Sequence, residues 1–318
     1  MKITVIGCGR WGSLIAWYLD SINSMVTLYG RSSSKHMQRF MLDRKNDVLE
    51  LPESIQLTND LDSVKDADLI VVSVNSQGFQ ALMDELQVFQ LKNKIFILCM
   101  KGIEITTGRR LSQVAKDNLD STNKVAVWLG PGHVQELYRG IPNCMVIDSE
   151  DEETKKMLVD QLSSELIRFY YGQDLIGNEI GAAAKNIIGI AAGMLDGLKI
   201  SSLKGALMSR GTREVGRLIQ AMGGNELSAY GLCHLGDYEA TVFSKYSHNR
   251  QFGESYINNE PYTDLAEGYY TVKAVLKLAS IYHVDMPIST AVYQILYEQK
   301  DAKDALNGLF MRSLKKEF

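Results

Sequence analysis

Ile3-Thr4-Val5-Ile6-Gly7-Cys8-Gly9-Arg10-Trp11-Gly12 is the stretch that decides the fold of this chain. Four strand-forming residues lead into the spacing Gly-x-Gly-x-x-Gly, and a helical pattern follows directly. In this context Gly7 permits a tight turn, Gly9 lets the backbone approach a pyrophosphate, and Gly12 allows close packing of helix on strand. The helix N-terminus then presents N–H groups to phosphates. The stretch predicts a dinucleotide-binding turn that includes Arg10 and Trp11; the alternative is an ordinary Gly-rich turn.

Short apolar runs alternate with amphipathic stretches through the first half of the chain. Residues 69–74 are almost continuously apolar, which is typical of a strand buried on both faces. Strands that alternate with helices indicate a mostly parallel sheet with crossover helices. We expect strands at 3–6, 25–29, 69–74, 94–100, 125–129, 143–148 and 167–171.

The pattern changes after Gly172, where small residues, Leu, Met and Tyr begin to recur at helical spacing. We expect long helices at 179–197, 204–222 and 263–282, with a shorter pair near the C-terminus. The predicted fold class is therefore α/β, with a Rossmann-type domain over residues 1–176 and an all-helical C-terminal domain over residues 177–318.

Composition narrows the function classes. The 318 residues carry 34 basic and 38 acidic side chains, a formal net charge of −4, which argues against non-specific nucleic-acid binding. The four cysteines, Cys8, Cys99, Cys144 and Cys233, are widely spaced, so we expect neither a disulfide framework nor a metal site. With no signal peptide or membrane span recognised, the sequence predicts a cytoplasmic protein.

The end of the second predicted strand bears on the choice between NAD and NADP. An acidic residue there would bind the ribose 2′-hydroxyl of NAD, but the sequence is Tyr29-Gly30-Arg31-Ser32-Ser33-Ser34. Arg31 and the neighbouring hydroxyls could hold the 2′-phosphate of NADP. We expect NADP or NAD as cofactor, with NADP favoured; the alternative is that Arg31 is a solvated surface residue.

Four further segments extend the pattern to the rest of the chain. They are Met100-Lys101-Gly102-Ile103-Glu104, Gly130-Pro131-Gly132-His133-Val134-Gln135-Glu136, Asn178-Glu179-Ile180-Gly181-Ala182-Ala183-Ala184-Lys185-Asn186-Ile187, and Leu235-Gly236-Asp237 through Thr241 to Ser247-His248-Asn249-Arg250. In this order they resemble the bacterial NAD(P)-dependent glycerol-3-phosphate dehydrogenase family over essentially the whole chain. The resemblance implies reversible reduction of dihydroxyacetone phosphate to glycerol 3-phosphate, a phosphorylated small-molecule substrate, and a homodimer.

The resemblance also implies the roles of individual residues. Lys185 matches the family's catalytic lysine and Lys101 its conserved active-site lysine, which would touch cofactor and substrate. Glu267 resembles a late cofactor contact. The remaining substrate-site positions are Gly130, Asp237, Thr241, His248, Asn249 and Arg250.

The residues themselves suggest the chemistry. Hydride arriving at a carbonyl carbon leaves negative charge on the oxygen, and a nearby ammonium can stabilise that charge and donate a proton. Lys185 follows a run of Gly and Ala that can bury it, and Asp237 could orient it. We therefore expect Lys185 to act as general acid in reduction and general base in oxidation. The alternative is a helix lysine that extends to solvent.

The chain departs from the family at the substrate-phosphate loop. The family has Arg-Asn-Arg, whereas this chain has His248-Asn249-Arg250, so an imidazole replaces a fixed bidentate cation. Arg250 or Lys204 is a candidate to compensate. Gly132 also stands where the family often has Ser. Two alternatives stay open: a related dehydrogenase of another small hydroxy acid or polyol phosphate, and a dinucleotide-binding regulatory protein without turnover.

Overall fold

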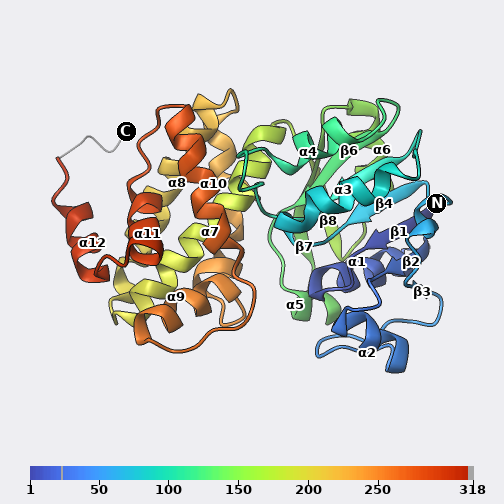
Figure 1. Cartoon of the computed structure of the whole chain (residues 1–318), viewed down its shortest axis with the longest axis horizontal. Helices are drawn as coiled ribbons and strands as arrows, with labels where there is room; N and C mark the ends of the chain where they lie inside the picture. Colours follow the sequence, from blue (N-terminus) through green and yellow to red (C-terminus); the bar gives the residue numbers. More distant parts are fainter. Residues whose placement is uncertain (23, 314–318) are drawn as a thin grey trace. The chain divides into compact units, whose positions relative to one another are not determined.

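The apolar runs form one eight-stranded sheet in the structure, a computed structural model that describes residues 1–22 and 24–313 (Figure 1). The strands are β1 (Lys2–Ile6), β2 (Met25–Tyr29), β3 (Gln56–Thr58), β4 (Leu69–Val72), β5 (Ile95–Leu98), β6 (Lys124–Leu129), β7 (Asn143–Ser149) and β8 (Ile167–Tyr171). Their order in the sheet is β3-β2-β1-β4-β5-β6-β7-β8. Neighbours run parallel except β6 and β7, which pair antiparallel. The predicted Rossmann-type, mostly parallel sheet is confirmed, and its order reverses between β1 and β4.

The strands carry buried apolar side chains on both faces of the sheet. Leu69 and Val71 belong to one large apolar cluster, together with Ile3 and Val5. Ile70 and Val72 are equally buried from solvent but do not belong to that cluster. Successive side chains of a strand point to opposite faces, so helices must cover both. The helices of this part are α1 (Arg10–Ser21), α2 (Lys35–Asp43), α3 (Phe79–Gln87), α4 (Leu111–Asn118), α5 (Val134–Tyr138) and α6 (Glu152–Leu162).

The later part of the chain is helical. Its helices are α7 (Leu175–Gly197), α8 (Lys204–Ala221), α9 (His248–Asn258), α10 (Glu267–Ile281), α11 (Pro287–Glu298) and α12 (Ala302–Phe310). A 3₁₀ turn (Leu235–Asp237) and a π-helical turn (Glu239–Phe243) lie between α8 and α9. The expected helices are present, but α7 begins four residues before the predicted 179, and α9 falls in a stretch where no helix was predicted.

The chain divides into two compact units. The first comprises Met1–Lys101 and Arg109–Glu179, and the second comprises Gly102–Gly108 and the residues from Ile180 onwards. The short segment between Lys101 and Arg109 belongs to the second unit, where Lys277 of α10 donates a hydrogen bond to the Thr106 carbonyl. Among the described residues, no helix has both the length and the apolar character needed to cross a membrane.

Candidate active site

The glycines of the first turn meet different surroundings. Gly7 has φ +111°, and a Cβ there would lie 2.1 Å from the Ser73 carbonyl oxygen. A Cβ on Gly12 would lie 1.9 Å from the Gly7 carbonyl oxygen, so the chain's own backbone requires both glycines. Gly9 differs, because a Cβ there would meet no atom within 4 Å. The open space beside Gly9 is where a pyrophosphate would need to approach the backbone.

The start of α1 offers hydrogen-bond donors without matching acceptors. Gly9 occupies the N-cap position of α1, no side chain caps the helix there, and its first turn has no acidic residue. Within the described part of the chain, the buried indole Nε1 of Trp11 has no hydrogen-bond partner. A helix N-terminus of this kind favours anions. This turn, which consists of Gly7, Gly9, Arg10, Trp11, Gly12 and the residue between the first two glycines, therefore fits the phosphates of a dinucleotide.

Lys101 lies at the carboxyl edge of the sheet, where ligands bind in open α/β folds. It follows β5, and its Nζ donates a hydrogen bond of 2.6 Å to the carbonyl oxygen of Gly130, which follows β6. The same ammonium lies 5.7 Å from the centre of the Trp11 ring. Lys101 is thus brought together with Gly130 and with Trp11 of the dinucleotide turn in the first unit.

Arg31 follows β2 at the same edge of the sheet. Its guanidinium donates a hydrogen bond of 2.6 Å to Glu85, and both side chains are largely exposed. Ser34 caps α2 by accepting from the Met37 N–H. Arg31 is therefore accessible to a cofactor phosphate, but a phosphate would have to share it with the Glu85 carboxylate.

Lys185 is buried in the second unit, with a side chain that is 7% exposed. Residues Ala182, Ala183 and Ala184 precede it on α7 and are fully buried, which draws the lysine inside. The ammonium forms an ion pair with Asp237 and donates a hydrogen bond of 3.0 Å to the Thr241 hydroxyl. That hydroxyl donates to the Asp237 carbonyl at 2.7 Å. Lys185, Asp237 and Thr241 therefore form one buried group, and the Lys185 side chain does not extend to solvent.

A buried histidine that the sequence did not single out supports this group. His234 Nδ1 lies 2.8 Å from the Gly181 carbonyl, and Nε2 lies 2.7 Å from the Tyr238 hydroxyl. A carbonyl only accepts, so Nδ1 carries the proton and Nε2 accepts from tyrosine. Burial lowers the pKa of His234 to about 4, an effect that the Lys185 ammonium reinforces. The neutral ring links α7, one turn before Lys185, to the turn that carries Asp237.

Asn249 links three helices close to Lys185. Its amide donates at 3.0 Å to the side-chain oxygen of Asn186, the residue after Lys185. Its own side-chain oxygen accepts from the Gly268 N–H at 2.8 Å. A Cβ on Gly268 would lie 2.6 Å from the Asn186 carbonyl, so the start of α10 approaches α7 closely. Glu267 is the first residue of α10, next to the glycine that makes this close approach.

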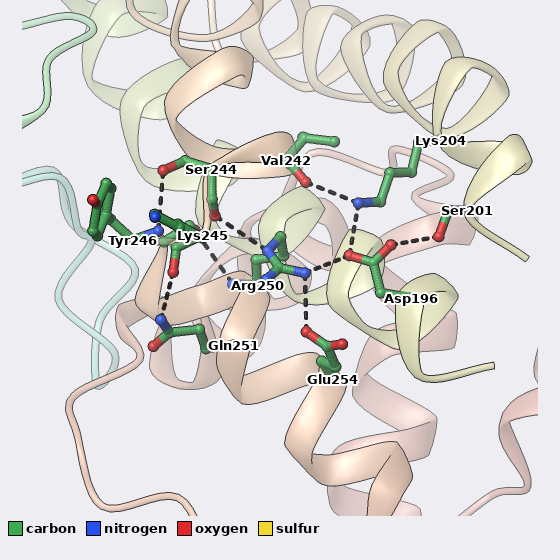
Figure 2. Close-up of polar contacts among 11 residues, drawn as sticks. Asp196, Ser201, Lys204, Val242, Ser244, Lys245, Tyr246, Arg250, Gln251 and Glu254 are labelled. Atoms are coloured by element: carbon green, nitrogen blue, oxygen red, sulfur yellow. Dashed lines mark hydrogen bonds and ion pairs between the residues drawn. The ribbon is translucent and has the colours of Figure 1, made fainter. Parts of the chain in front are cut away.

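Arg250 and Lys204 both meet Asp196 (Figure 2). Arg250 donates to Asp196 at 2.6 Å and to Glu254 at 2.9 Å, and Lys204 donates to Asp196 at 2.7 Å. Burial opposes ionisation of Asp196, but hydrogen bonds from Lys204, Ser201 and Arg250 outweigh it and keep the pKa of this carboxyl below its usual range. Arg250 also donates through Nε to the Ser244 carbonyl. Both cations therefore already have carboxylate partners, and Arg250 fixes the loop before α9.

His248 is the first residue of α9 and is one-third exposed. Its Nδ1 lies 3.0 Å from the Tyr262 hydroxyl and 3.7 Å from the Asp264 carboxylate. The imidazole that replaces the family's arginine is therefore held by contacts of its own. Gly132, the other departure, packs tightly: a Cβ there would lie 2.7 Å from the Met145 side chain and 3.3 Å from Trp11.

The described residues include no cluster of three or more His, Cys, Asp or Glu that could hold a metal ion. All four cysteines are free thiols. The groups that the structure does assemble are a dinucleotide turn on a Rossmann-type sheet and a buried lysine–aspartate pair in a helical unit. Together they define the class of the protein: a nicotinamide-dependent dehydrogenase.

Comparison with known proteins then gives the family. The model of the NAD-dependent glycerol-3-phosphate dehydrogenase N-terminus matches residues 2–155, and the C-terminal model matches residues 174–307. The chain belongs to the NAD-dependent glycerol-3-phosphate dehydrogenase family. It is 34% identical to a glycerol-3-phosphate dehydrogenase [NAD(P)+] of Prosthecochloris aestuarii, and the match covers 100% of both chains. A second such protein, from Thermoanaerobacter sp., is also 34% identical, with 100% of this chain and 99% of the relative covered.

Solved structures agree with this assignment. The glycerol-3-phosphate dehydrogenase of Coxiella burnetii superimposes with a TM-score of 0.91 at 28% identity, covering 98% of this chain and 99% of that one. A ketopantoate reductase from Ralstonia eutropha has a TM-score of 0.66 at 11% identity, covering 96% and 100% of the two chains. That second likeness shows a shared fold alone. The predicted family, fold class and nicotinamide cofactor are therefore confirmed.

Proposed function

We propose that this protein reduces dihydroxyacetone phosphate reversibly to glycerol 3-phosphate with NADPH or NADH. The observation that carries the proposal is the buried Lys185, which follows three alanines on α7. Its ammonium forms an ion pair with Asp237 and a hydrogen bond with Thr241. Family membership supports the same reaction. The proposed domains are residues 1–176 for cofactor binding and residues 177–318 for substrate binding and catalysis.

The proposed chemistry needs one proton and one hydride. A bound reduced nicotinamide would supply the hydride, which would add to the carbonyl carbon of the substrate as the C=O π bond breaks. The Lys185 ammonium then transfers a proton to the resulting alkoxide oxygen, which gives the hydroxyl of the product. Asp237 would orient the lysine through their ion pair. In the oxidative direction the neutral amine accepts that proton from the hydroxyl.

Other residues are proposed to position the two molecules. The first turn, Lys101 and Glu267 would contact the cofactor, with Arg31 toward the 2′-phosphate of NADP. Lys101, Gly130, Thr241, His248 and Asn249 would surround the substrate. Arg250 stays in the proposed substrate site, where we expect it to act mainly by fixing its loop, because its guanidinium already meets Asp196 and Glu254.

Substitution of Lys185 tests the proposal directly. We expect Lys185→Ala to lower kcat for dihydroxyacetone phosphate reduction by about 10²–10⁴-fold, the usual worth of a positioned proton donor. Lys185→Arg keeps the charge but is a far weaker acid, so it should restore little activity. The measurement is oxidation of NADPH and NADH followed by absorbance, at saturating cofactor.

The control is Lys199→Ala, which removes an exposed lysine just beyond the same helix. It should leave kcat within about twofold, in the range of surface substitutions. Cofactor binding by Lys185→Ala, followed by tryptophan fluorescence, shows whether the first unit is folded, and far-UV circular dichroism shows whether the helical second unit is folded. A folded Lys185→Ala enzyme that keeps near-normal kcat would contradict the proposed role.

His248 favours a second candidate, a dehydrogenase of another small hydroxy acid or polyol phosphate. An imidazole binds phosphate most strongly when it is protonated, so a phosphorylated substrate should show a KM that rises with pH. His248→Arg should lower that KM and flatten its pH dependence. Preference for a non-phosphorylated compound at every pH, in a panel of such substrates, would support the second candidate.

We also propose a cytoplasmic homodimer that prefers NADP. The free, mostly buried thiols support a reducing compartment, and the family resemblance supports the dimer. The accessible Arg31 supports the preference for NADP. Sedimentation of the purified protein measures the oligomeric state, and comparison of kcat/KM for NADPH and NADH measures the cofactor preference.

A further inference from the structure

A cavity of about 530 Å³ lies within the second unit, among α7, α8, α11 and α12. α12 lies next to α11 (Figure 1). Its side chains form one wall of the cavity. Apolar side chains make most of the lining, including Met194 and Leu195 of α7, Ile288 of α11, and Leu306 and Leu309 of α12. A mostly apolar cavity of this volume is typical of sites for small organic ligands.

The wall from α8 changes character along its length. Leu203, Ala206 and Leu207 line the cavity at the start of the helix, and Arg210, Arg213 and Arg217 line it further along. Each of these positions lies three or four residues from another one in the set, so they share one face of α8. The cavity therefore has an apolar end and a cationic end.

The charges of the lining are not balanced. Four arginines and two carboxylates line the cavity, although the whole chain has a net charge of −4. Both carboxylates have partners: Glu214 accepts from the Ile288 and Ser289 N–H groups, and Asp285 pairs with Arg312. Arg217 donates to the Asp285 carbonyl at 2.8 Å, which fixes its guanidinium. An anionic group would complement the excess positive charge of this end.

We propose that this cavity binds a long-chain carboxylate, with its hydrocarbon chain among α7, α11 and α12 and its head group on Arg210 and Arg213. Guanidinium groups bind carboxylates with paired hydrogen bonds, and the apolar walls favour removal of a hydrocarbon chain from water. The site shares α7 with Lys185 but contains none of the residues proposed for catalysis. It therefore goes beyond the proposed function.

Calorimetric titration of the full chain with decanoate is the first test. We expect saturable binding of about one decanoate per chain. Ala206→Trp should lower the affinity at least tenfold, because Ala206 is exposed and its side chain would fill the mouth of the cavity. The matched control is Ala221→Trp, an exposed position of the same helix outside the cavity, and it should bind as the wild type does.

The cationic end is tested separately. Arg210→Gln combined with Arg213→Gln should weaken decanoate about tenfold or more, which is typical of losing a charge-assisted contact, and leave 1-decanol little changed. A photoreactive fatty acid should label peptides of α7, α11 or α12, which needs no variant to fold. Absence of saturable decanoate binding, labelling elsewhere, or equal loss of decanoate and decanol would overturn the proposal.

Two other occupants of the cavity, residues 314–318 and a second copy of the chain, would give results that differ from those of a long-chain carboxylate. Residues 314–318 follow the lining residue Ser313 and lie outside the described part of the chain. A chain that ends at Ser313 should bind decanoate as tightly as the full chain; a tenfold gain would mean that those residues compete for the cavity, against the proposal. Failure of decanoate to bind, with a sedimentation change in Ala206→Trp, would assign the cavity to a second copy.

Discussion

A single buried ring shows how one residue can order a site without touching the reacting atoms. His234 lies 53 positions from Gly181 in the sequence, yet its Nδ1 holds the Gly181 carbonyl, and its Nε2 holds Tyr238 beside Asp237. The ring must stay neutral for both contacts, because protonated Nε2 could not accept from the tyrosine hydroxyl. The ring is completely buried, which favours the neutral form.

His234 should make stability depend on pH. Its pKa is about 4 in the folded protein, against about 6.5 in the unfolded chain, so the unfolded state binds the extra proton between these values. The free energy of unfolding should therefore fall by about 3 kcal/mol as pH drops from about 6.5 to about 4. His234→Asn keeps a donor to Gly181 and does not titrate, so it should lose most of this dependence.

Urea unfolding of both proteins at several pH values measures the effect. The difference between the two curves isolates His234, because the other titrating groups contribute to both. Parallel pH profiles for the wild type and His234→Asn would contradict the argument.

At the scale of elements, one carboxylate joins the two helices that lie at the last two of the three chain crossings between the units. Glu179, the last residue of the first unit, accepts from the Ser112 N–H at 2.9 Å, the Ser112 hydroxyl at 2.6 Å and the Arg110 guanidinium at 2.5 Å. Arg110 and Ser112 stand at the start of α4, just after the chain returns from the second unit. The contacts tie the start of α7 to the start of α4.

Removal of this carboxylate should be costly. Glu179→Ala leaves the Arg110 guanidinium buried without its carboxylate, and we expect a loss of about 3–5 kcal/mol in unfolding free energy. Lys156→Ala breaks an exposed ion pair with Asp160, which solvent screens, and should leave the unfolding midpoint almost unchanged. Denaturant unfolding compares the two. A double Arg110→Ala, Glu179→Ala variant should lose less than the sum of its singles; additive losses would mean that the pair is not coupled.

The elements also show what sequence alone could predict. Apolar runs over β1 and β4 and the glycine spacing before α1 are local signals, so the sheet and the cofactor turn could be predicted. β3 is only three residues, Gln-Leu-Thr, and α9 is polar with a left-handed C-cap at Asn259, so neither has a clear apolar period. The His234 contacts and the Asp196 group depend on pairings between distant segments, which no local pattern reveals.

At the scale of the whole molecule, the two units can be observed separately. All three tryptophans, Trp11, Trp17 and Trp128, lie in the first unit, so tryptophan fluorescence reports unfolding of that unit. A ligand that binds only the folded state stabilises it by RT ln(1 + [L]/Kd), which is about 2.7 kcal/mol at a concentration of 100 Kd. We expect NADPH to raise the tryptophan-detected unfolding midpoint accordingly.

Two glycine substitutions separate cofactor binding from folding. Gly9→Val projects into open space, so the variant should unfold within about 1 kcal/mol of the wild type without cofactor, as a substitution without a buried clash does. The new side chain would occupy the approach of the pyrophosphate, so NADPH should no longer raise the midpoint. Gly12→Ala drives a methyl into the Gly7 carbonyl and should lower stability with or without NADPH. Full stabilisation of Gly9→Val by NADPH would place the phosphates elsewhere and remove the cofactor role of this turn.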